Sequence, residues 1–290
     1  MKGSGRAVAH GAVTILNAFA TGKGAAMGVD LWTRARVTLQ DGGGASFGIA
    51  SSDEQVSSQL AIRVLDKVLE QYGYAGKLHG EVVTSSNIPT AVGLKSSSAA
   101  ANAVALATAS ALDREPDDDV LVEIGVDASL ECGVSLTGAY DDSFASWHGG
   151  AVLTDNDRRK VEKVLKIPDD LRIIILVPPR QTLTGNLDRH RFAPIKRISR
   201  LAYDAARNGQ LWDALTLNGL AFSAVLGEDP RPALSAIEAG ALGAGLSGKG
   251  PAVVAAVEES HSKMVRQALE KFEGRIIETE PNYSRAGVET

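Results

Sequence analysis

The stretch Asn87–Asn102, which reads NIPTAVGLKSSSAAAN, decides the fold of this chain. The preceding residues, Leu78–Thr84, include two adjacent valines and predict a β-strand. The following residues, Ala99–Leu112, are rich in alanine and almost free of charge, which predicts a buried helix. The sequence therefore predicts a strand, a loop punctuated by Pro89 and Gly93, and then the N-terminus of a helix.

This helix N-terminus is suited to binding a phosphate. The first N–H groups of a helix have no partner within it, and the helix dipole is positive there. The serines at 96–98 offer N-cap hydroxyls and leave room for an anion, Lys95 adds a positive charge, and a serine hydroxyl can ligate Mg²⁺. The alternative is a capped core helix that binds nothing. We favour the phosphate site.

Composition limits the class of protein. The 290 residues allow one large domain or two smaller ones. Hydrophobic residues make up 44% and charged residues 22%, as in soluble globular proteins. The net charge of −5 argues against a nucleic-acid or anionic membrane surface, and no segment approaches the roughly 18 apolar residues of a membrane span. We expect no nucleic-acid and no membrane partner.

The cellular compartment is predicted from the cysteine content and the N-terminus. Cys132 is the single cysteine, which excludes an internal disulfide and fits a reducing compartment. Lys2 and Arg6 precede the uncharged stretch Ala7–Gly22, which has some features of a signal peptide. Gly11 interrupts this stretch, where a signal peptide favours leucine. We expect a cytoplasmic protein.

The pattern along the chain predicts alternating strands and helices. Strands are expected within 6–19 and at 28–40, 78–84, 149–154, 171–177, 252–257 and 275–279. Helices are expected at 52–72, 99–112, 116–131, 232–239 and 260–272, with two or three more within 193–226. A turn is expected at 41–44, an irregular segment at 133–148 and a glycine-rich loop at 241–251. A composition shift at 155–170 predicts a boundary between domains 1–160 and 161–290.

Several charged residues are candidates for chemistry. Asp141 and Asp142 follow Gly138 in a polar segment, where a carboxylate can orient or deprotonate a hydroxyl during phosphoryl transfer. The alternative is a solvated turn. Glu131 ends the preceding helix and is either a Mg²⁺ ligand or an exposed helix terminus. Lys23 lies between two glycines, from where it can reach a phosphate or a substrate hydroxyl.

The loop LGAGLSGKGP at 242–251 only partly matches two nucleotide-binding patterns. Gly243, Gly245 and Gly248 spell G-x-G-x-x-G, but the expected order is helix before and strand after, the reverse of a dinucleotide-binding motif. The P-loop pattern requires a hydroxyl residue where Gly250 stands. We interpret the segment as a flexible loop that approaches a phosphate or covers the first loop. The alternative is a tight turn from helix to strand.

Other chemistries have little support. The five histidines show no metal-ligand spacing, and no G-x-S-x-G nucleophile elbow is present. Arg180, Arg189 and Arg191 flank the sequence TLTGN, where they either pair with a substrate carboxylate or belong to a solvated loop.

Two of these segments together resemble the motifs of the GHMP kinase superfamily. The second family motif, P-x-x-x-G-L-x-S-S-A-A, is similar to PTAVGLKSSSAA at 89–100, which has one extra residue. The third, G-x-G-x-S-G-x-G-P, is approached by GAGLSGKGP at 243–251. The resemblance covers nearly the whole chain. It implies an α+β, two-domain GHMP kinase fold with a βαβ-type N-terminal half, a ferredoxin-like C-terminal half and the active site between them.

Within the superfamily, the chain looks most like the archaeal-type shikimate kinases. The segments AVTILNAFATGKGAAMGV and TGAYDD carry this resemblance. It implies ATP-dependent phosphorylation of shikimate to shikimate 3-phosphate, in the synthesis of chorismate and the aromatic amino acids. A homoserine or mevalonate-type alcohol kinase, and a non-catalytic metabolite-binding regulator on the same fold, remain alternatives.

The resemblance also implies roles for individual residues. ATP and Mg²⁺ are the implied cofactors, with Ser98 and Glu131 as metal ligands and Asp141 as the carboxylate that activates the hydroxyl. The extra residue after Gly138 leaves open whether Asp141 or Asp142 acts, with Lys23 as a further catalytic candidate. The implied nucleotide-binding residues are Pro89, Gly93, Leu94, Lys95, Ser96, Ser97, Ser98 and Ala99 in the second motif, and Gly245, Ser247 and Gly248 in the third.

Overall fold

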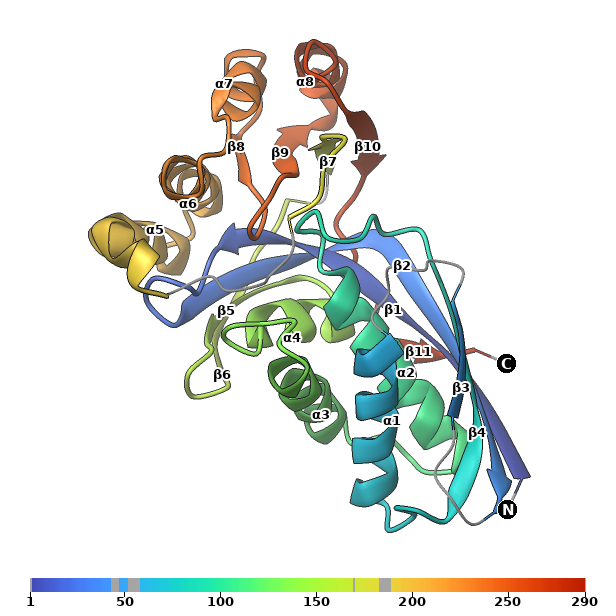
Figure 1. The fold of residues 1–290 in the computed structure, drawn as a ribbon. Coiled ribbons are helices and arrows are strands. Elements are labelled where there is room, and N and C mark those ends of the chain that lie inside the picture. Colours follow the sequence, from blue (N-terminus) through green and yellow to red (C-terminus); the bar gives the residue numbers. More distant parts are fainter. Residues whose placement is uncertain (1, 43–46, 52–57, 169, 183–188, 290) are drawn as a thin grey trace.

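Two β-sheets, one in each half of the chain, form the framework of the molecule (Figure 1). A computed structural model describes residues 2–42, 47–51, 58–168, 170–182 and 189–289. The predicted turn at 41–44 and the start of the predicted helix at 52–72 lie partly outside the described residues. Within the described part of the chain, the larger sheet has seven strands and the smaller sheet has four.

A long antiparallel hairpin is the centre of the larger sheet. Its strands are β1 (Lys2–Leu16) and β2 (Lys23–Asp41). The next strands, β3 (Phe47–Ser51) and β4 (Leu78–Ser86), are parallel to each other, and α1 (Ser58–Gln71) connects them. This βαβ unit confirms the predicted N-terminal architecture. A second hairpin, β5 (Ala151–Asp155) and β6 (Lys160–Leu165), extends the sheet from β2.

Helices α1 to α4 lie on one face of the larger sheet, and α2 contacts the other three helices (Figure 1). The remaining three are α2 (Ser96–Ala111), α3 (Asp118–Glu131) and α4 (Tyr140–His148). The small residues of α2 allow an unusually close approach to β1. A Cβ atom at Gly3 or Gly5 would lie 2.0 or 2.2 Å from the carbonyl oxygens of Ala111 and Ala107. The abundance of glycine and alanine is therefore a packing requirement.

The smaller sheet has the ferredoxin-like strand order. Its strands are β7 (Leu171–Val177), β8 (Gly243–Leu246), β9 (Val253–Glu258) and β10 (Arg275–Thr279), and they are arranged β10-β7-β9-β8. All the pairs are antiparallel. The strands of the C-terminal half therefore run in the order 4-1-3-2, which confirms the predicted ferredoxin-like topology.

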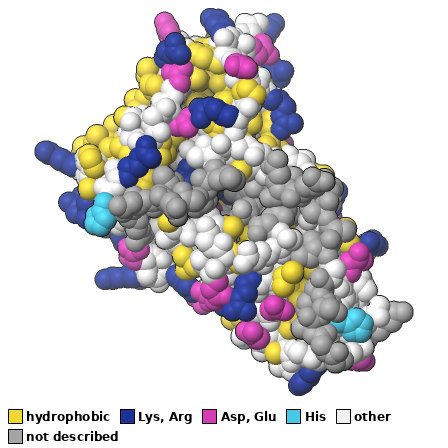
Figure 2. Space-filling model, in the orientation of Figure 1, with side chains coloured by type: hydrophobic (Ala, Val, Ile, Leu, Met, Phe, Trp, Pro, Cys, Tyr) yellow, Lys and Arg dark blue, Asp and Glu magenta, His cyan; other side chains and the backbone are white. Residues whose placement is uncertain are grey.

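Helices α5 to α8 belong to this second half. They are α5 (Lys196–Arg207), α6 (Leu211–Leu226), α7 (Arg231–Glu238) and α8 (Ser262–Leu269), with 3₁₀ turns η1 (Arg189–Ile195) and η2 (Glu259–His261). Figure 2 shows hydrophobic side chains on the surface over this half of the molecule, in the upper part of the view. The large exposed apolar side chains here include Leu201, Leu234 and Met264.

The chain returns to the larger sheet after β10. Asp30 N donates to Glu280 O at 2.9 Å, and Gly150 N donates to Asn282 O at 2.7 Å. The short strand β11 (Gly287–Val288) then pairs with β1. Residues 280–288 therefore belong to the larger sheet of the N-terminal half. Strand β6 also belongs to that sheet, although most of it follows residue 160. The division of the chain at 160/161 stays a prediction.

Three local expectations are corrected by the structure. The segment 133–148 is not irregular throughout, because Tyr140–His148 forms α4 and buries Trp147 completely. The loop predicted at 241–251 contains the strand β8. The serines at 96–98 do not cap α2; Lys95 is the N-cap residue, with a left-handed backbone (φ 63°) and no side-chain cap. The strands β3, β6 and β11 were not expected.

Among the described residues, no helix has both the length and the apolar character needed to cross a membrane.

A glycine contact joins α6 to β8 and supplies a test of the packing. A Cβ atom at Gly219 would lie 2.3 Å from the Gly245 Cα. Gly219→Ala should therefore lower the free energy of unfolding by about 1–3 kcal/mol, although helix propensity alone would raise it by about 1 kcal/mol. Gly125→Ala in α3 is the matched control, because its Cβ would make an ordinary 3.4 Å contact with Ala101 Cβ. Urea unfolding measures both variants, and a similar gain in stability for both would contradict the contact.

Candidate active site

The second-motif loop presents the N-terminus of α2 to a cavity between the two halves. Ala91, Gly93 and Lys95 have positive φ angles of 56°, 92° and 63°, which together turn the chain sharply into the helix. The first N–H groups of α2, at residues 96–98, have no carbonyl partner within the helix. They and the positive end of the helix dipole form an anion-binding position.

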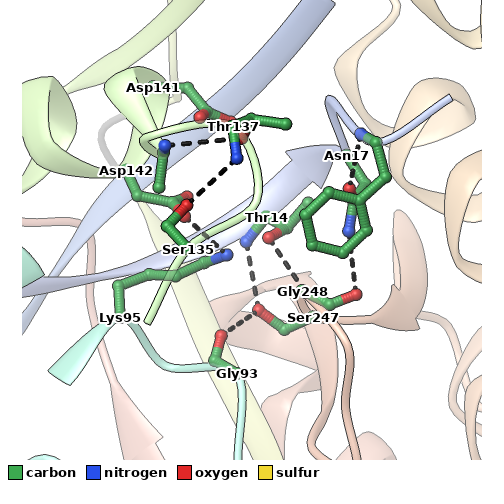
Figure 3. A network of polar contacts seen from close by, with 12 residues as sticks. Thr14, Asn17, Gly93, Lys95, Ser135, Thr137, Asp141, Asp142, Ser247 and Gly248 are labelled. Carbon is green, nitrogen blue, oxygen red and sulfur yellow. Dashed lines mark hydrogen bonds and ion pairs between the residues drawn. The ribbon is translucent and has the colours of Figure 1, made fainter. Parts of the chain in front are cut away.

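The third-motif loop is fastened to the second by the Ser247 hydroxyl. Ser247 Oγ donates to Gly93 O at 2.8 Å and accepts from Thr14 N at 3.1 Å (Figure 3). A Cβ atom at Gly93 would lie 2.1 Å from Ser247 O, so only glycine allows this approach. One buried side chain therefore joins β1, the second-motif loop and the third-motif loop.

Thr14 and Asn17 hold the next residue of the third-motif loop. Gly248 N donates to Thr14 Oγ1 at 2.9 Å, and Asn17 Nδ2 donates to Gly248 O at 3.0 Å (Figure 3). The backbone of Asn17 is itself held, because its N–H donates to the buried Asn218 Oδ1 at 2.9 Å. These hydrogen bonds thus fix the end of β1 and the β8–β9 loop relative to each other.

The cavity enclosed by these loops has a volume of about 340 Å³. Its polar lining comes from the end of β1, the second- and third-motif loops, the last turn of α3, the α3–α4 segment, the first turn of α4 and the segment after β7. The polar or charged lining residues are Thr14, Asn17, Thr90, Lys95, Ser96, Ser97, Ser98, Ser129, Ser135, Thr137, Asp141, Asp142, Thr182 and Lys249. No arginine lines it among the residues that the structure describes.

The two adjacent aspartates lie in the first turn of α4 and have different partners. Asp142 Oδ2 forms an ion pair with Lys95 Nζ at 3.0 Å (Figure 3). Its Oδ1 is buried and makes no hydrogen bond within the described chain. Asp141 Oδ1 accepts from Asn156 Nδ2 at 2.7 Å, and its carboxylate packs against Gly24 of β2. Asp142 is therefore directed to the helix N-terminus, and Asp141 to the sheet.

Burial raises the pKa of Asp141. Its side chain is enclosed by protein, and the neighbouring charge of Asp142 adds to the effect, so that the pKa rises to about 7. The charge of Lys95 and the hydrogen bond from Asn156 act in the opposite direction but are smaller. At neutral pH, Asp141 is therefore partly protonated.

Most of the residues that the sequence predicted for the site, from the second motif and elsewhere, line this cavity. Gly93, Lys95, Ser96, Ser97, Ser98, Asp141, Asp142 and Gly248 line it. Leu94 and Ala99 are buried beside it, and Ser247 fastens the loops. Pro89 lines a separate, open hollow with Arg180. Gly245 packs against α6, where its Cβ would lie 2.6 Å from Leu215 O, so its position serves packing.

The structure does not bring Glu131 to the cavity. Its carboxylate is ion-paired with Arg63 and with Lys67 Nζ at 2.7 Å, and its side chain is 42% exposed. These partners lower its pKa. The expectation that Glu131 ligates Mg²⁺ beside Ser98 does not agree with this placement, because both partners already neutralise the carboxylate.

Lys23 is also directed away from the cavity. Its Nζ donates to Asp155 Oδ2 and to Glu162 Oε1, each at 2.7 Å. The two carboxylates raise its pKa, although partial burial acts against them. Lys23 therefore connects β2 to the β5–β6 hairpin, and the lysine beside the aspartates is Lys95.

The predicted arginine cluster does not converge on the cavity. Arg180 forms a bidentate pair with Glu228, and Arg191 donates to Val225 O. The TLTGN sequence between them lies largely outside the described residues.

Several residues that hold or line this site had no role predicted from the sequence, among them Thr14, Asn17, Asn156 and Lys249. Asn17 was visible as a polar residue in an apolar strand, and Lys249 as the lysine of a failed P-loop match. The third-motif segment was expected to approach a phosphate or to cover the first loop, but neither residue was singled out for a place in the cavity.

The raised pKa of Asp141 predicts a pH-dependent stability. The folded-state pKa of about 7 exceeds the ordinary value of 3.8, so the stability linked to this proton is complete below pH 3.8 and is lost as the pH rises to about 7. Asp141→Asn keeps a neutral side chain. Its free energy of unfolding relative to wild type should therefore rise by about 2.5 kcal/mol between pH 5 and pH 8. Denaturant titration at both pH values measures this, and a constant difference would contradict a buried, partly protonated Asp141.

Family models match both halves of the chain. The model described as GHMP kinases N terminal domain matches residues 59–150, and the model described as GHMP kinases C terminal matches residues 194–274. The first covers the second motif, the aspartate pair and most of the cavity lining. The second covers most of the ferredoxin-like half, including the third-motif loop.

Curated relatives match over nearly the full length. The shikimate kinase of Methanothrix thermoacetophila is 41% identical over 94% of this chain and 92% of its own length. The shikimate kinase of Thermococcus kodakarensis is 40% identical over 95% of this chain and 99% of its own length.

Solved structures share the fold at lower identity. A homoserine kinase from Cytophaga hutchinsonii has a TM-score of 0.77 and 19% identity, and the alignment covers 100% of this chain and 98% of that one. The mevalonate kinase of Methanococcus jannaschii has a TM-score of 0.72 and 17% identity, over 96% and 98% of the two chains. Together with the motif loops and their cavity, these findings show that the chain belongs to the GHMP kinase family.

Proposed function

We propose that this protein transfers the γ-phosphoryl group of ATP to a hydroxyl of shikimate, which gives shikimate 3-phosphate. The observation that carries the proposal is the convergence of a helix N-terminus, Lys95 and Asp142 on one cavity. Membership of a kinase family supports ATP as the donor. Shikimate as the acceptor rests on relatives of that name at about 40% identity.

The phosphates of ATP are proposed to bind at the first turn of α2. The N–H groups of residues 96–98 and the Lys95 ammonium supply positive charge there, and Gly93 and Gly248 line the same cavity. Mg²⁺ fits this arrangement through the Ser98 hydroxyl, since this cation usually combines few protein oxygens with water and phosphate. When bound, Mg²⁺ neutralises developing charge on the phosphates.

Asp142 is proposed to act on the acceptor hydroxyl. Lys95 holds Oδ2 at 3.0 Å beside the phosphate position, and the buried Oδ1 has no hydrogen-bond donor among the described residues. Asp142 lines the cavity, so its carboxylate can receive the proton of an acceptor O–H bound there. In the transfer step the acceptor oxygen bonds to the γ-phosphorus as the bond to the ADP oxygen breaks, and the hydroxyl proton passes to Asp142. Asp141 holds α4 against the sheet through Asn156.

This mechanism predicts unequal effects of the two aspartates. Asp142→Asn should lower kcat by about 10²–10⁴-fold because it removes the proton acceptor. Asp141→Asn should change kcat much less, since its hydrogen bond with Asn156 can still form. A coupled ADP-release assay compares them, with circular dichroism as the folding control. A larger loss for Asp141→Asn would assign the catalytic role to Asp141.

The metal site predicts a second contrast. Ser98→Ala should raise the Mg²⁺ concentration for half-maximal rate by about 10-fold, equivalent to roughly 1.4 kcal/mol. Glu131→Ala should leave it unchanged, because that carboxylate pairs with Arg63 and Lys67 outside the cavity. Mg²⁺ titration of the initial rate measures both. Dependence on Glu131 alone would restore it as the ligand and remove Ser98.

The identity of the acceptor is the most specific part of the proposal. The alternatives are homoserine, a mevalonate-type alcohol, or a non-catalytic metabolite-binding role on the same fold. ADP release is to be measured with ATP, Mg²⁺ and each of shikimate, homoserine and mevalonate in parallel. Turnover with shikimate alone is the expected result, and turnover with another alcohol would replace the substrate. We further propose a cytoplasmic enzyme, in agreement with its lone cysteine and its use of ATP.

A further inference from the structure

Helix α4, which carries both aspartates, has no side-chain cap of its own. Its N-cap residue, Ala139, has a left-handed backbone (φ 52°) and no side chain that can accept a hydrogen bond. The first N–H groups of a helix have no partner within it and need one elsewhere. Asp141 N finds this partner in another element, because it donates to Asn156 Oδ1 at 3.3 Å. Asn156 lies in the turn between β5 and β6 and therefore caps α4 from outside the helix.

The same amide also binds the side chain of Asp141. Asn156 Nδ2 donates to Asp141 Oδ1 at 2.7 Å, so both ends of one amide contact one residue. Thr154 Oγ1 donates to Asn156 Oδ1 at 2.7 Å as well. The flipped amide would place Nδ2 against the Asp141 N–H and Oδ1 against the carboxylate, so only one orientation satisfies all the partners.

Asn156 is itself held by the larger sheet. Its side chain is buried, and its backbone N–H donates to Gly22 O at 2.8 Å. Strand β5 ends one residue before it and pairs with β2, and α4 packs against β5 (Figure 1). A Cβ atom at Gly24 of β2 would lie 2.4 Å from Asp141 Oδ2. The carboxylate of Asp141 is therefore enclosed between Asn156 and the backbone of β2.

This contact sets the direction of the next residue, Asp142. Successive residues of an α-helix are about 100° apart around its axis. While Asp141 is held on the sheet, Asp142 therefore points to a different side, where its Oδ2 pairs with Lys95 Nζ at 3.0 Å beside the N-terminus of α2 (Figure 3). A rotation of the first turn by one residue would exchange the two carboxylates. The bonds from Asn156 oppose such a rotation, because both would break.

We infer that Asn156 is a positioning residue for phosphoryl transfer, which caps α4 from the β5–β6 turn and thereby directs Asp142, and not Asp141, to the acceptor hydroxyl. The inference rests on the proposed function, because Asn156 acts through Asp142. Asn156 lies behind Asp141 and outside the cavity lining that the structure describes. Its loss should therefore lower kcat, whereas the KM for ATP, whose phosphates bind at α2, should change little.

The first test measures the cap without turnover. Hydrogen exchange in the first turn of α4, residues 140–143, is compared between wild type and Asn156→Ala. Exchange should be about 10-fold faster in the variant, because the Asp141 N–H loses its acceptor. Arg158→Ala is the matched control in the same turn, since its side chain is 83% exposed, and it should exchange as wild type does. Equal exchange in wild type and Asn156→Ala would overturn the cap, whatever the acceptor alcohol is.

The second test exchanges the donor and the acceptor of the side-chain hydrogen bond. In the double variant Asp141→Asn/Asn156→Asp, the new amide donates to the new carboxylate, which still accepts from Thr154 Oγ1 and from the backbone N–H of residue 141. Asn156→Ala should lower kcat by about 10–100-fold, and the double variant should recover most of this loss. Asp141→Asn/Asn156→Ala has the same amide at 141 without its partner and should stay slow. Coupled ADP release measures kcat and the KM for ATP.

Two kinetic results would overturn the inference. Faster exchange with an unchanged kcat in Asn156→Ala would make Asn156 a support of the fold only. Normal exchange without recovery of kcat in Asp141→Asn/Asn156→Asp would mean that the cap does not position Asp142. Wild-type turnover with another alcohol and not with shikimate would overturn only the proposed acceptor, and the variants are then compared with that alcohol.

Discussion

The active-site geometry depends on one buried hydroxyl. Ser247 Oγ donates to the carbonyl of Gly93 and accepts from the N–H of Thr14. These three residues lie far apart in the sequence. Thr14 and Gly93 belong to the N-terminal half of the molecule, and Ser247 belongs to the ferredoxin-like half. Breaking a buried hydrogen bond of this kind costs free energy, because the separated polar groups have no water to bond with in its place. It sets the distance between the helix that receives phosphate and the loop that covers it.

The close approach explains why the two motifs have their composition. Gly93 has no room for a side chain against Ser247, and Gly219 has none against Gly245. Each contact is possible only because the glycine has no Cβ atom on the side where the two backbones meet. The glycines that look like a nucleotide-binding pattern thus have two different tasks. Gly93 and Gly248 shape the cavity, and Gly245 allows a helix to lie against a strand.

The sequence predicted the site best where the signal was local. The strand, loop and helix at 78–112 follow from apolar pattern, proline and glycine, and the resemblance added the fold of both halves. Glu131 and Lys23 were expected at the site. Their positions in the sequence do not reveal which side chains their charges contact in the folded chain. Their ion pairs with Lys67 and with Asp155 depend on packing between distant elements. The different orientations of Asp141 and Asp142 likewise depend on the backbone geometry of α4, which the sequence pattern does not give. The position of Lys249 depends in the same way on the geometry of its loop.

The return of residues 280–288 to the larger sheet affects how the protein is made. The hydrogen-bonding edge of β1 that β11 occupies stays open on the ribosome until the whole ferredoxin-like half has been synthesised. An unpaired edge strand can pair with other chains. The N-terminal half, although it carries the second motif and both aspartates, therefore completes its sheet only after the ferredoxin-like half has been synthesised.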